Sequence, residues 1–188
     1  MAGKRPPSAK EGAGARPPRP ISGREAPSRA SEAAPRPVRE SRVEMLELMY
    51  PNDANPLGSI MGGRVMHFID VAAAISAHRH ARRPCVTASV DHIDFHTPVR
   101  VGDLLVLHAS VNYTGRTSIE VGVRVEVEDR TTGKRTHTSS AYLTFVALSD
   151  RGEPMPVPPL LLETAEDRRR CREGQRRRAQ RLRKLGKV

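Results

Sequence analysis

The residue of this 188-residue chain with the clearest capacity for chemistry is an aspartate in the middle of an apolar run. Asp70 lies within "GGRVMHFIDVAAAI", residues 62 to 75, a stretch otherwise typical of a buried helix. A carboxylate in an apolar interior is costly unless it finds a partner or shifts its pKa. Asp70 therefore predicts either a structural hydrogen bond or a role in catalysis.

Other side chains that carry chemistry form no recognisable site. His78 and His80 are two residues apart, a spacing that does not put both rings on one helix face, and His67 lies a further three turns away. No cluster of cysteines or carboxylates completes a metal site, so we expect neither a metal nor a cofactor. No serine sits in a nucleophile elbow, which argues against a serine hydrolase. Cys85 and Cys171 are far apart and indicate no disulfide framework, which fits a cytoplasmic location.

The positive charge of the chain belongs to its two ends. The net charge is +11, of which residues 1–40 carry +5 and residues 163–188 carry +7, leaving −1 for the rest. Residues 1–40 are rich in proline and poor in large apolar side chains, so we expect a disordered tail. Their proline density argues against a mitochondrial targeting helix. No apolar run reaches the roughly 20 residues of a membrane span, and no signal-peptide core is present.

Residues 41–150 contain the elements that must position Asp70. A proline-free apolar stretch from Gly63 to about His80 predicts a helix of about five turns, which "RRP" ends. β-Branched, largely alternating segments bounded by turn residues predict strands. The expected strands are 42–50, 85–99, 104–115, 117–129 and 134–148. One long helix on one antiparallel sheet is a two-layer α+β domain, and this order of elements predicts a hot-dog fold with the helix packed on a curved sheet.

An ordered series of motifs resembles a known family. Asn55 and Gly58 in "PNDANPLGSIMGG", the Gly62-Gly63 pair, Asp70, and then "VTASVDHIDF", "VGD" and "TGRTS" are similar to acyl-CoA thioesterases of the YciA and brain acyl-CoA hydrolase type. The resemblance covers about residues 42–150. It implies hydrolysis of an acyl-CoA thioester, most typically a fatty acyl-CoA, to a free acid and CoA, with Asn55 and Asp70 as the catalytic pair. It also implies assembly as a trimer of dimers. Pro56 departs from the pattern and stiffens the loop that aims Asn55.

The residues are chemically suited to this reaction, although each has a structural alternative. The amides of Gly62 and Gly63 begin a helix, so they lack intrahelical acceptors and could stabilise an oxyanion; alternatively the pair is a permissive turn. Asp70 could activate water as a general base or act as a nucleophile; alternatively it is only hydrogen-bonded, or paired with His67. Asn55 could hold water or polarise the carbonyl, or it could simply form a turn.

Basic and hydroxyl side chains near two predicted turns are candidates for binding the CoA phosphates. The resemblance implies that the "GRTS" turn lies near CoA, and Arg116, Thr117 and Ser118 could form charge-assisted hydrogen bonds with a phosphate. Arg82 and Arg83 could contribute as well, although a basic helix end is favourable without any ligand.

The spacing along the helix predicts an active site shared between subunits. Gly62 and Asp70 are eight residues apart, about 12 Å along one helix. No single thioester carbon can lie about 3 Å from both groups. We therefore expect a homodimer with two sites, each using Asn55, Gly62 and Gly63 of one chain and Asp70 of the other.

The C-terminal segment, residues 151–188, reads as a linker and a basic extension that can form a helix broken or frayed at Gly174. A solvated tail is the simplest interpretation. The extension could instead bind nucleic acid, anionic lipid or the CoA phosphates of a neighbouring subunit. Nucleic acid is not expected, and because stacking aromatic residues are missing, any such binding would be electrostatic and salt-sensitive. Two other functions remain open: a non-catalytic acyl-CoA-binding or regulatory protein, and an RNA-associated protein whose folded body serves only for oligomerisation.

Overall fold

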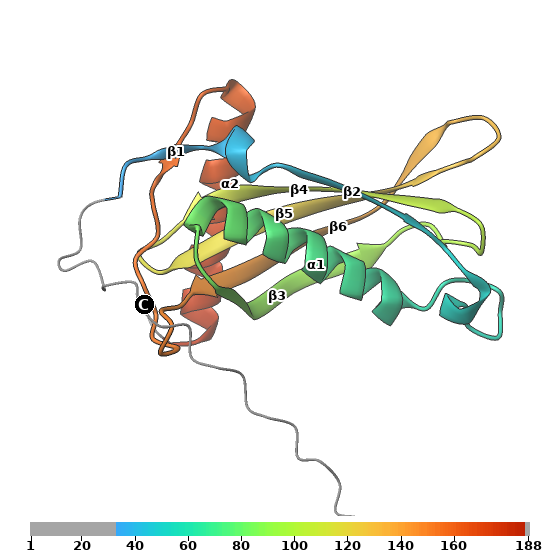
Figure 1. Cartoon of the computed structure of the whole chain (residues 1–188), viewed down its shortest axis with the longest axis horizontal. Helices are drawn as coiled ribbons and strands as arrows, with labels where there is room; N and C mark the ends of the chain where they lie inside the picture. The colour runs from blue at the N-terminus through green and yellow to red at the C-terminus, as the bar shows by residue number, and fades with distance from the viewer. Residues whose placement is uncertain (1–32, 187–188) are drawn as a thin grey trace, which may run out of the picture.

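A computed structural model of the chain describes residues 33–186, apart from the side chain of His92, and shows one antiparallel sheet with a helix on each face (Figure 1). The expected disorder of residues 1–32 lies outside the described residues. The elements are β1 (Arg36–Pro37), the 3-10 helices η1 (Val38–Ser41) and η2 (Pro51–Asp53), β2 (Val43–Leu48), α1 (Gly62–Ala81), β3 (Cys85–Phe95), β4 (Leu104–Thr114), β5 (Ser118–Glu128), β6 (Arg135–Ala147), β7 (Leu160–Leu161) and α2 (Ala165–Lys184).

The main sheet has five strands in the order β2-β4-β5-β6-β3. All of its strand pairs are antiparallel, as the alternating sequence pattern predicts. β3 follows α1 in sequence but pairs with β6, so β2 and β3 form the two edges of the sheet. On β4, alternate residues such as Leu105 and Leu107 point into the core, while Ser110 and Asn112 belong to the opposite face.

Helix α1 packs along the inner face of the sheet through one continuous stripe. Val65, Phe68, Ile69, Ala72 and Ser76 are buried at the three- and four-residue spacing of a helix. Ala73 and Ala77 are fully buried as well, and their small side chains let the helix lie close to the strands. The helix ends at Ala81 because Arg82 takes a left-handed conformation, with φ 54°, before Pro84.

The ordered structure begins earlier than the sequence indicates. We expected disorder to residue 40, but β1 pairs in parallel with β7, and Val38 and Ser41 are buried. The Ser41 hydroxyl accepts a hydrogen bond from the Val111 amide at 3.0 Å. This short strand escapes sequence analysis because it has only two residues, one of them proline, and its partner lies more than 120 residues away.

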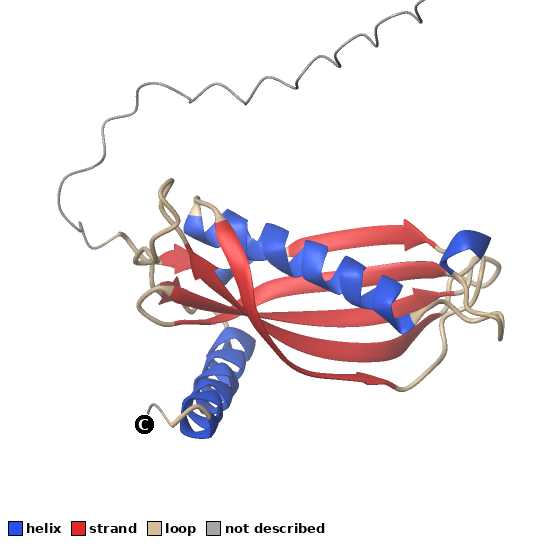
Figure 2. Cartoon of the chain, turned by 90° about the horizontal axis from the view of Figure 1, so that it is seen from below, coloured by secondary structure: helices blue, strands red, loops and turns tan. Residues whose placement is uncertain are grey.

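The C-terminal extension is a docked helix and not a solvated tail. Figure 2 shows α2 on the side of the sheet opposite α1. The helix is continuous from Ala165 to Lys184, so the predicted break at Gly174 is wrong. Gly174 is buried, and a Cβ there would come within 2.8 Å of Glu120 Oε1 and 2.9 Å of Tyr113 Cβ. Glycine at this position is therefore needed for close packing. Within residues 33–186, no helix is long and apolar enough to span a membrane.

Candidate active site

Asp70 lies on the flank of α1, beside the buried stripe. Its side chain is half-buried, and the hydroxyl of Thr87 on β3 donates a 2.7 Å hydrogen bond to Asp70 Oδ1. Within the described chain no hydrogen bond or ion pair joins Asp70 to His67, so the sequence-based alternative of a pair with His67 is wrong. The aromatic contact of His67 is instead with Phe68. The hydrogen bond from Thr87 therefore fixes the Asp70 carboxylate through one of its oxygens, Oδ1.

Thr87 contacts Asp70 and is the residue of the candidate site that sequence analysis missed. It is exposed near the start of edge strand β3, 17 residues after Asp70. Its contact with Asp70 depends on how α1 crosses the edge of the sheet, and local alternation carries no information on that crossing. The only available signal was a polar residue on the strand that directly follows the helix.

Asn55 is fixed by the loop that precedes α1. Its Oδ1 accepts hydrogen bonds from the amides of Leu57 at 2.9 Å and Ser59 at 3.2 Å. The backbone closes the same loop, since the Asn55 amide donates to the Ser59 carbonyl at 2.7 Å. The side-chain oxygen is therefore occupied by the turn, and the amide nitrogen Nδ2 is the group left to donate to a ligand.

The start of α1 offers two free amide donors. Met61 is the N-cap residue and gives no side-chain cap, and within the described residues no acceptor is found for the amides of Gly62 and Gly63. Neither glycine has a positive φ, so the backbone does not require glycine there and a permissive turn does not explain the pair. A Cβ on Gly62 would lie 3.7 Å from the Phe95 ring, and one on Gly63 would meet nothing within 4 Å.

The candidate phosphate-binding residues lie at the other end of the molecule. α1 begins beside η2 and ends near the β4–β5 turn, as Figures 1 and 2 both show. Arg116 is exposed in that turn, and Gly115 closes it by donating to the Ser118 carbonyl at 2.8 Å; the Thr117 carbonyl accepts from Ala147 at 3.1 Å. Arg82 is exposed at the end of α1, next to Arg83. In one chain these five residues are thus separated from Asn55, Gly62 and Gly63.

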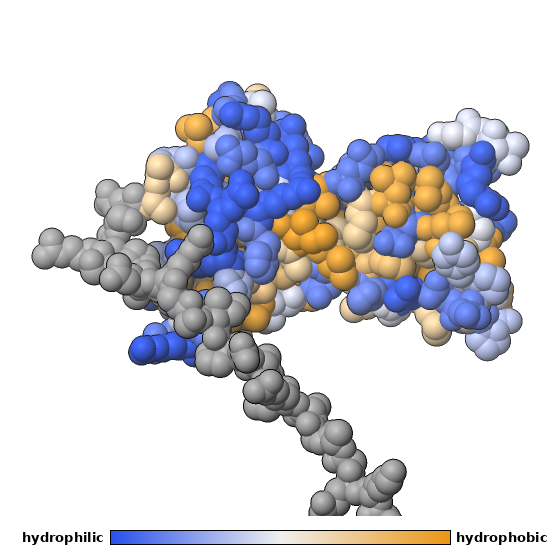
Figure 3. All heavy atoms as spheres, viewed as in Figure 1, coloured by the Kyte–Doolittle hydropathy of each residue, from blue (hydrophilic) through white to orange (hydrophobic). Residues whose placement is uncertain are grey.

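Large apolar side chains are exposed along α1 and β3, the two elements that carry Asp70 and Thr87. Met61 and Met66 on the α1 side and Val90 and Phe95 on β3 are each 43–46% exposed. We call this surface the α1–β3 face; Figure 3 shows apolar residues gathered on the α1 side of the molecule. Among the described strands β3 pairs only with β6, so its outer edge is open over 11 residues. Such an apolar face beside an open edge is typical of a surface that another chain covers.

The protonation and burial of the remaining reactive groups do not favour a catalytic role. Burial raises the pKa of the Cys85 thiol to about 11, which keeps it protonated at neutral pH. His80 is fully buried, its Nε2 lies 2.8 Å from the Pro158 carbonyl oxygen, and burial lowers its pKa. No group of three His, Cys, Asp or Glu side chains in the described part of the chain is arranged to hold a metal ion.

Comparison with known proteins identifies the family. The family model described as the thioesterase superfamily matches residues 57–134. A Bacillus subtilis protein named as an uncharacterized acyl-CoA thioester hydrolase is 42% identical over 129 residues, which cover 69% of this chain and 75% of that protein. The cytosolic acyl coenzyme A thioester hydrolase of Mus musculus is 36% identical over 142 residues, 74% of this chain but 37% of the mouse protein.

Solved structures agree with these matches. An apo-hexameric acyl-CoA thioesterase superposes with a TM-score of 0.78 at 41% identity, covering 81% of this chain and 97% of that one. The Staphylococcus aureus acyl-CoA hydrolase, solved with butyryl coenzyme A and coenzyme A, gives a TM-score of 0.73 at 35% identity, with coverages of 80% and 94%. That hydrolase has also been solved with an asparagine, an aspartate or a threonine replaced by alanine.

The predicted α+β class and hot-dog fold are confirmed, as is the resemblance on which the sequence analysis relied. The chain belongs to the thioesterase superfamily, in the group whose members are named acyl-CoA thioester hydrolases.

Proposed function

We propose that this protein hydrolyses acyl-CoA thioesters to a free carboxylic acid and CoA, with Asp70 as the general base. The names of its relatives support the substrate class. The observation that carries the assignment to Asp70 is its hydrogen bond from Thr87, because that bond occupies Oδ1 and leaves Oδ2 to take a proton from water. The relative named as cytosolic also supports our expectation of a cytoplasmic location.

The proposed reaction uses the free donors as an oxyanion site. Water attacks the thioester carbonyl carbon while Asp70 accepts its proton. The carbonyl oxygen becomes negative and is stabilised by the amides of Gly62 and Gly63 and by Asn55 Nδ2. Collapse of this intermediate breaks the carbon–sulfur bond and releases the CoA thiolate, which takes the proton from Asp70. No covalent acyl-enzyme is needed.

The same three side-chain types have been substituted in a related enzyme. In the Staphylococcus aureus hydrolase the replaced asparagine and aspartate are 15 residues apart, and the aspartate and threonine are 17 apart. Asn55, Asp70 and Thr87 have these same separations here. This coincidence supports treating the three as one functional set.

We propose further that each site is shared between two chains. The rise of about 12 Å from Gly62 to Asp70 keeps the donors and the base of one chain apart. Pairing of two chains through the α1–β3 face would cover its exposed apolar side chains and the open edge of β3, and would bring the donors of one chain toward the base of its partner. The hexameric relative supports a trimer of dimers as the larger assembly.

The substrate's nucleotide would lie at the β4–β5 turn of the assembled dimer. Arg116 is exposed there, with Thr117 and Ser118 beside it, and Arg82 and Arg83 end the neighbouring helix. These groups could bind the CoA phosphates through charge-assisted hydrogen bonds. No cofactor is required, since CoA is part of the substrate.

The test is release of free thiol from a panel of acyl-CoAs that differ in chain length. The wild-type protein should release CoA, and Asp70→Asn should lower the rate by about 10²- to 10⁴-fold, because it removes the base. Asp150→Asn, in an exposed turn, is the matched control and should keep full activity. Hydrolysis that survives Asp70→Asn would reject the mechanism. Binding of acyl-CoA without hydrolysis would reject the enzyme in favour of a non-catalytic binding protein.

A further inference from the structure

One side of α2 is fixed against the sheet by buried ion pairs. Arg177 contacts Glu120 at 2.7 Å, and only 1% of the Glu120 side chain is exposed. Arg181 reaches the same carboxylate at 3.1 Å and also pairs with Asp91. The guanidinium of Arg177 stacks over the Tyr142 ring at 3.6 Å. These contacts neutralise two of the helix arginines inside the protein.

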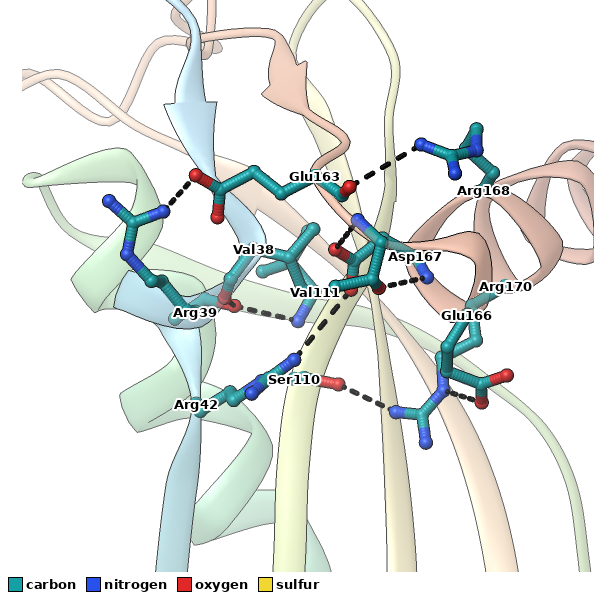
Figure 4. A network of polar contacts seen from close by, with 12 residues as sticks. Val38, Arg39, Arg42, Ser110, Val111, Glu163, Glu166, Asp167, Arg168 and Arg170 are labelled. Carbon is teal, nitrogen blue, oxygen red and sulfur yellow. Dashed lines mark hydrogen bonds and ion pairs between the residues drawn. The ribbon is translucent and has the colours of Figure 1, made fainter.

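The first turns of α2 are fixed just as firmly (Figure 4). Thr164 and Asp167 form a reciprocal capping box, and Arg170 donates to the Ser110 hydroxyl at 3.1 Å. Glu166 pairs with Arg169 and Arg170. α2 is therefore a rigid element, with both halves anchored to the outer face of the sheet.

The opposite side of α2 carries a separate set of arginines. Arg168, Arg172, Arg176 and Arg183 are all exposed, and within residues 33–186 none of them has a carboxylate partner. At 100° per residue they fall within about 80° of arc, centred opposite the docked side. We call these four residues the arginine row.

The acidic residues of the helix do not neutralise the arginine row. Glu173 pairs with Arg169, and Glu166 is likewise taken up by neighbouring arginines, which lower its pKa to about 2. Asp167 is buried in the capping box. The arginine row therefore presents four uncompensated positive charges over about 22 Å of rigid helix.

We propose that the arginine row binds the phosphate backbone of nucleic acid without sequence specificity, a function separate from hydrolysis. A line of guanidinium groups on a rigid helix complements a polyanion whose charges repeat every few ångströms. An anionic membrane is a poorer match, because helices that bind membranes insert an apolar face. The outward side of α2 has none: besides the arginine row its exposed residues are Ala165, Arg169, Gln175, Ala179 and Gln180, and Leu182 at its margin is half-buried. Sequence analysis took the extension as a solvated tail, and a linear sequence does not separate the docked arginines from the free ones.

The expected salt dependence makes the proposal quantitative. Four phosphate contacts give a slope of log K against log salt of about −3.6 on duplex DNA. The basic residues of the N-terminal 32 residues would add to this slope in the full chain. The difference between variants that share that segment is therefore the diagnostic quantity.

The experiment is fluorescence anisotropy of a labelled duplex of about 20 base pairs with the full chain, between about 50 and 200 mM KCl. The double variant R172Q/R176Q should weaken binding by about tenfold or more and reduce the magnitude of the slope by about 1.8. R130Q/K134Q removes the same charge from the exposed β5–β6 hairpin and should leave both quantities near wild type. Thiol release should be the same for all three proteins, so failure of the proposed hydrolase function would be seen separately.

Three results would overturn the proposal. The first is absence of duplex binding by the wild-type chain. The second is an equal loss of binding in both double variants, which would show that only net charge matters. The third is binding to vesicles rich in phosphatidylglycerol without binding to the duplex, which would identify a lipid surface as the partner.

Discussion

On the α2 side of the sheet, Glu120 has its arginine partners within the same chain. On the α1 side, Asp70 has a single neutral donor, and apolar side chains of α1 and β3 are exposed. The ion pairs of the first surface are formed within a single chain. The second surface leaves an open strand edge and exposed apolar side chains, and under the proposed shared site a partner chain would cover them. The contrast separates stability from the proposed chemistry: buried ion pairs anchor α2 on one face of the sheet, and the candidate catalytic groups lie on the other.

The largest effect on the free energy of unfolding is expected on the α2 side of the sheet. Glu120→Ala would leave Arg177 and Arg181, whose side chains are only 20% and 18% exposed, without their shared carboxylate. Breaking a buried pair costs about 3–5 kcal/mol in the free energy of unfolding. Glu128→Ala on the same strand removes a more exposed pair with Arg135 and should cost less than about 1 kcal/mol. Chemical denaturation of both variants measures the difference, and equal losses would mean that the α2 contact is not buried.

Two glycine substitutions sharpen the same comparison. Gly174→Ala should lower the free energy of unfolding by about 1–3 kcal/mol, because the new methyl group has no room beside Glu120 and Tyr113. Gly63→Ala has open space, so it should leave stability unchanged or raise it by up to about 1 kcal/mol. Thiol release should fall only for Gly63→Ala, since its methyl group covers an amide that the substrate must approach. If Gly174→Ala lowered thiol release without lowering stability, Gly174 would not have the purely structural role assigned to it.

On the α1 side of the sheet, the hydrogen bond from Thr87 to Asp70 should matter more for the rate of hydrolysis than for stability. Thr87→Val removes the hydroxyl at nearly constant volume and should lower kcat/KM by about tenfold, or about 1.4 kcal/mol. Because Thr87 is exposed, the melting temperature should change little. Thr87→Ser keeps the hydroxyl donor and should keep activity near wild type. Equal activity of the wild type, Thr87→Val and Thr87→Ser would show that Thr87 has no role in the reaction.

His80 links the end of α1 to the segment that leads to α2, and its lowered pKa predicts a modest effect of pH on stability. It lies at the end of α1 and contacts the Pro158 carbonyl in the segment leading to α2. Burial lowers its pKa below the ordinary 6.5, so the unfolded chain binds the proton first as pH falls. Its contribution to stability should be complete above pH 6.5 and decline below it, by at most about 1.4 kcal/mol per pH unit. His80→Gln should flatten this part of the stability profile; an unchanged slope would contradict the assignment to His80.

Sequence analysis was most accurate where structure is set by local pattern. The helix predicted from Gly63 to about His80 spans Gly62–Ala81, and the strand predicted over 104–115 spans Leu104–Thr114. Their periodicity and turn residues are local properties. Asp70 could be singled out for the same reason, since a carboxylate in an apolar run is visible without any tertiary information.

What sequence analysis missed depends on contacts between distant elements. The Thr87–Asp70 bond requires the crossing of a helix over an edge strand, and the docking of α2 requires Glu120 to be buried beneath it. Gly174 looked like a helix breaker because propensity counts against glycine, yet tertiary packing demands it there. β1 and β7 are two residues each and carry no periodic signal at all.

The most direct test of the shared site is complementation between two inactive variants. Asp70→Asn and Asn55→Ala chains, each inactive alone, are mixed under conditions that exchange subunits, and thiol release is measured once native mass spectrometry confirms mixed dimers. Half of the dimers should be mixed, and one of the two sites in each should carry both intact residues, so about a quarter of wild-type activity should return. Mixed dimers with no recovered activity would contradict a site built from two chains.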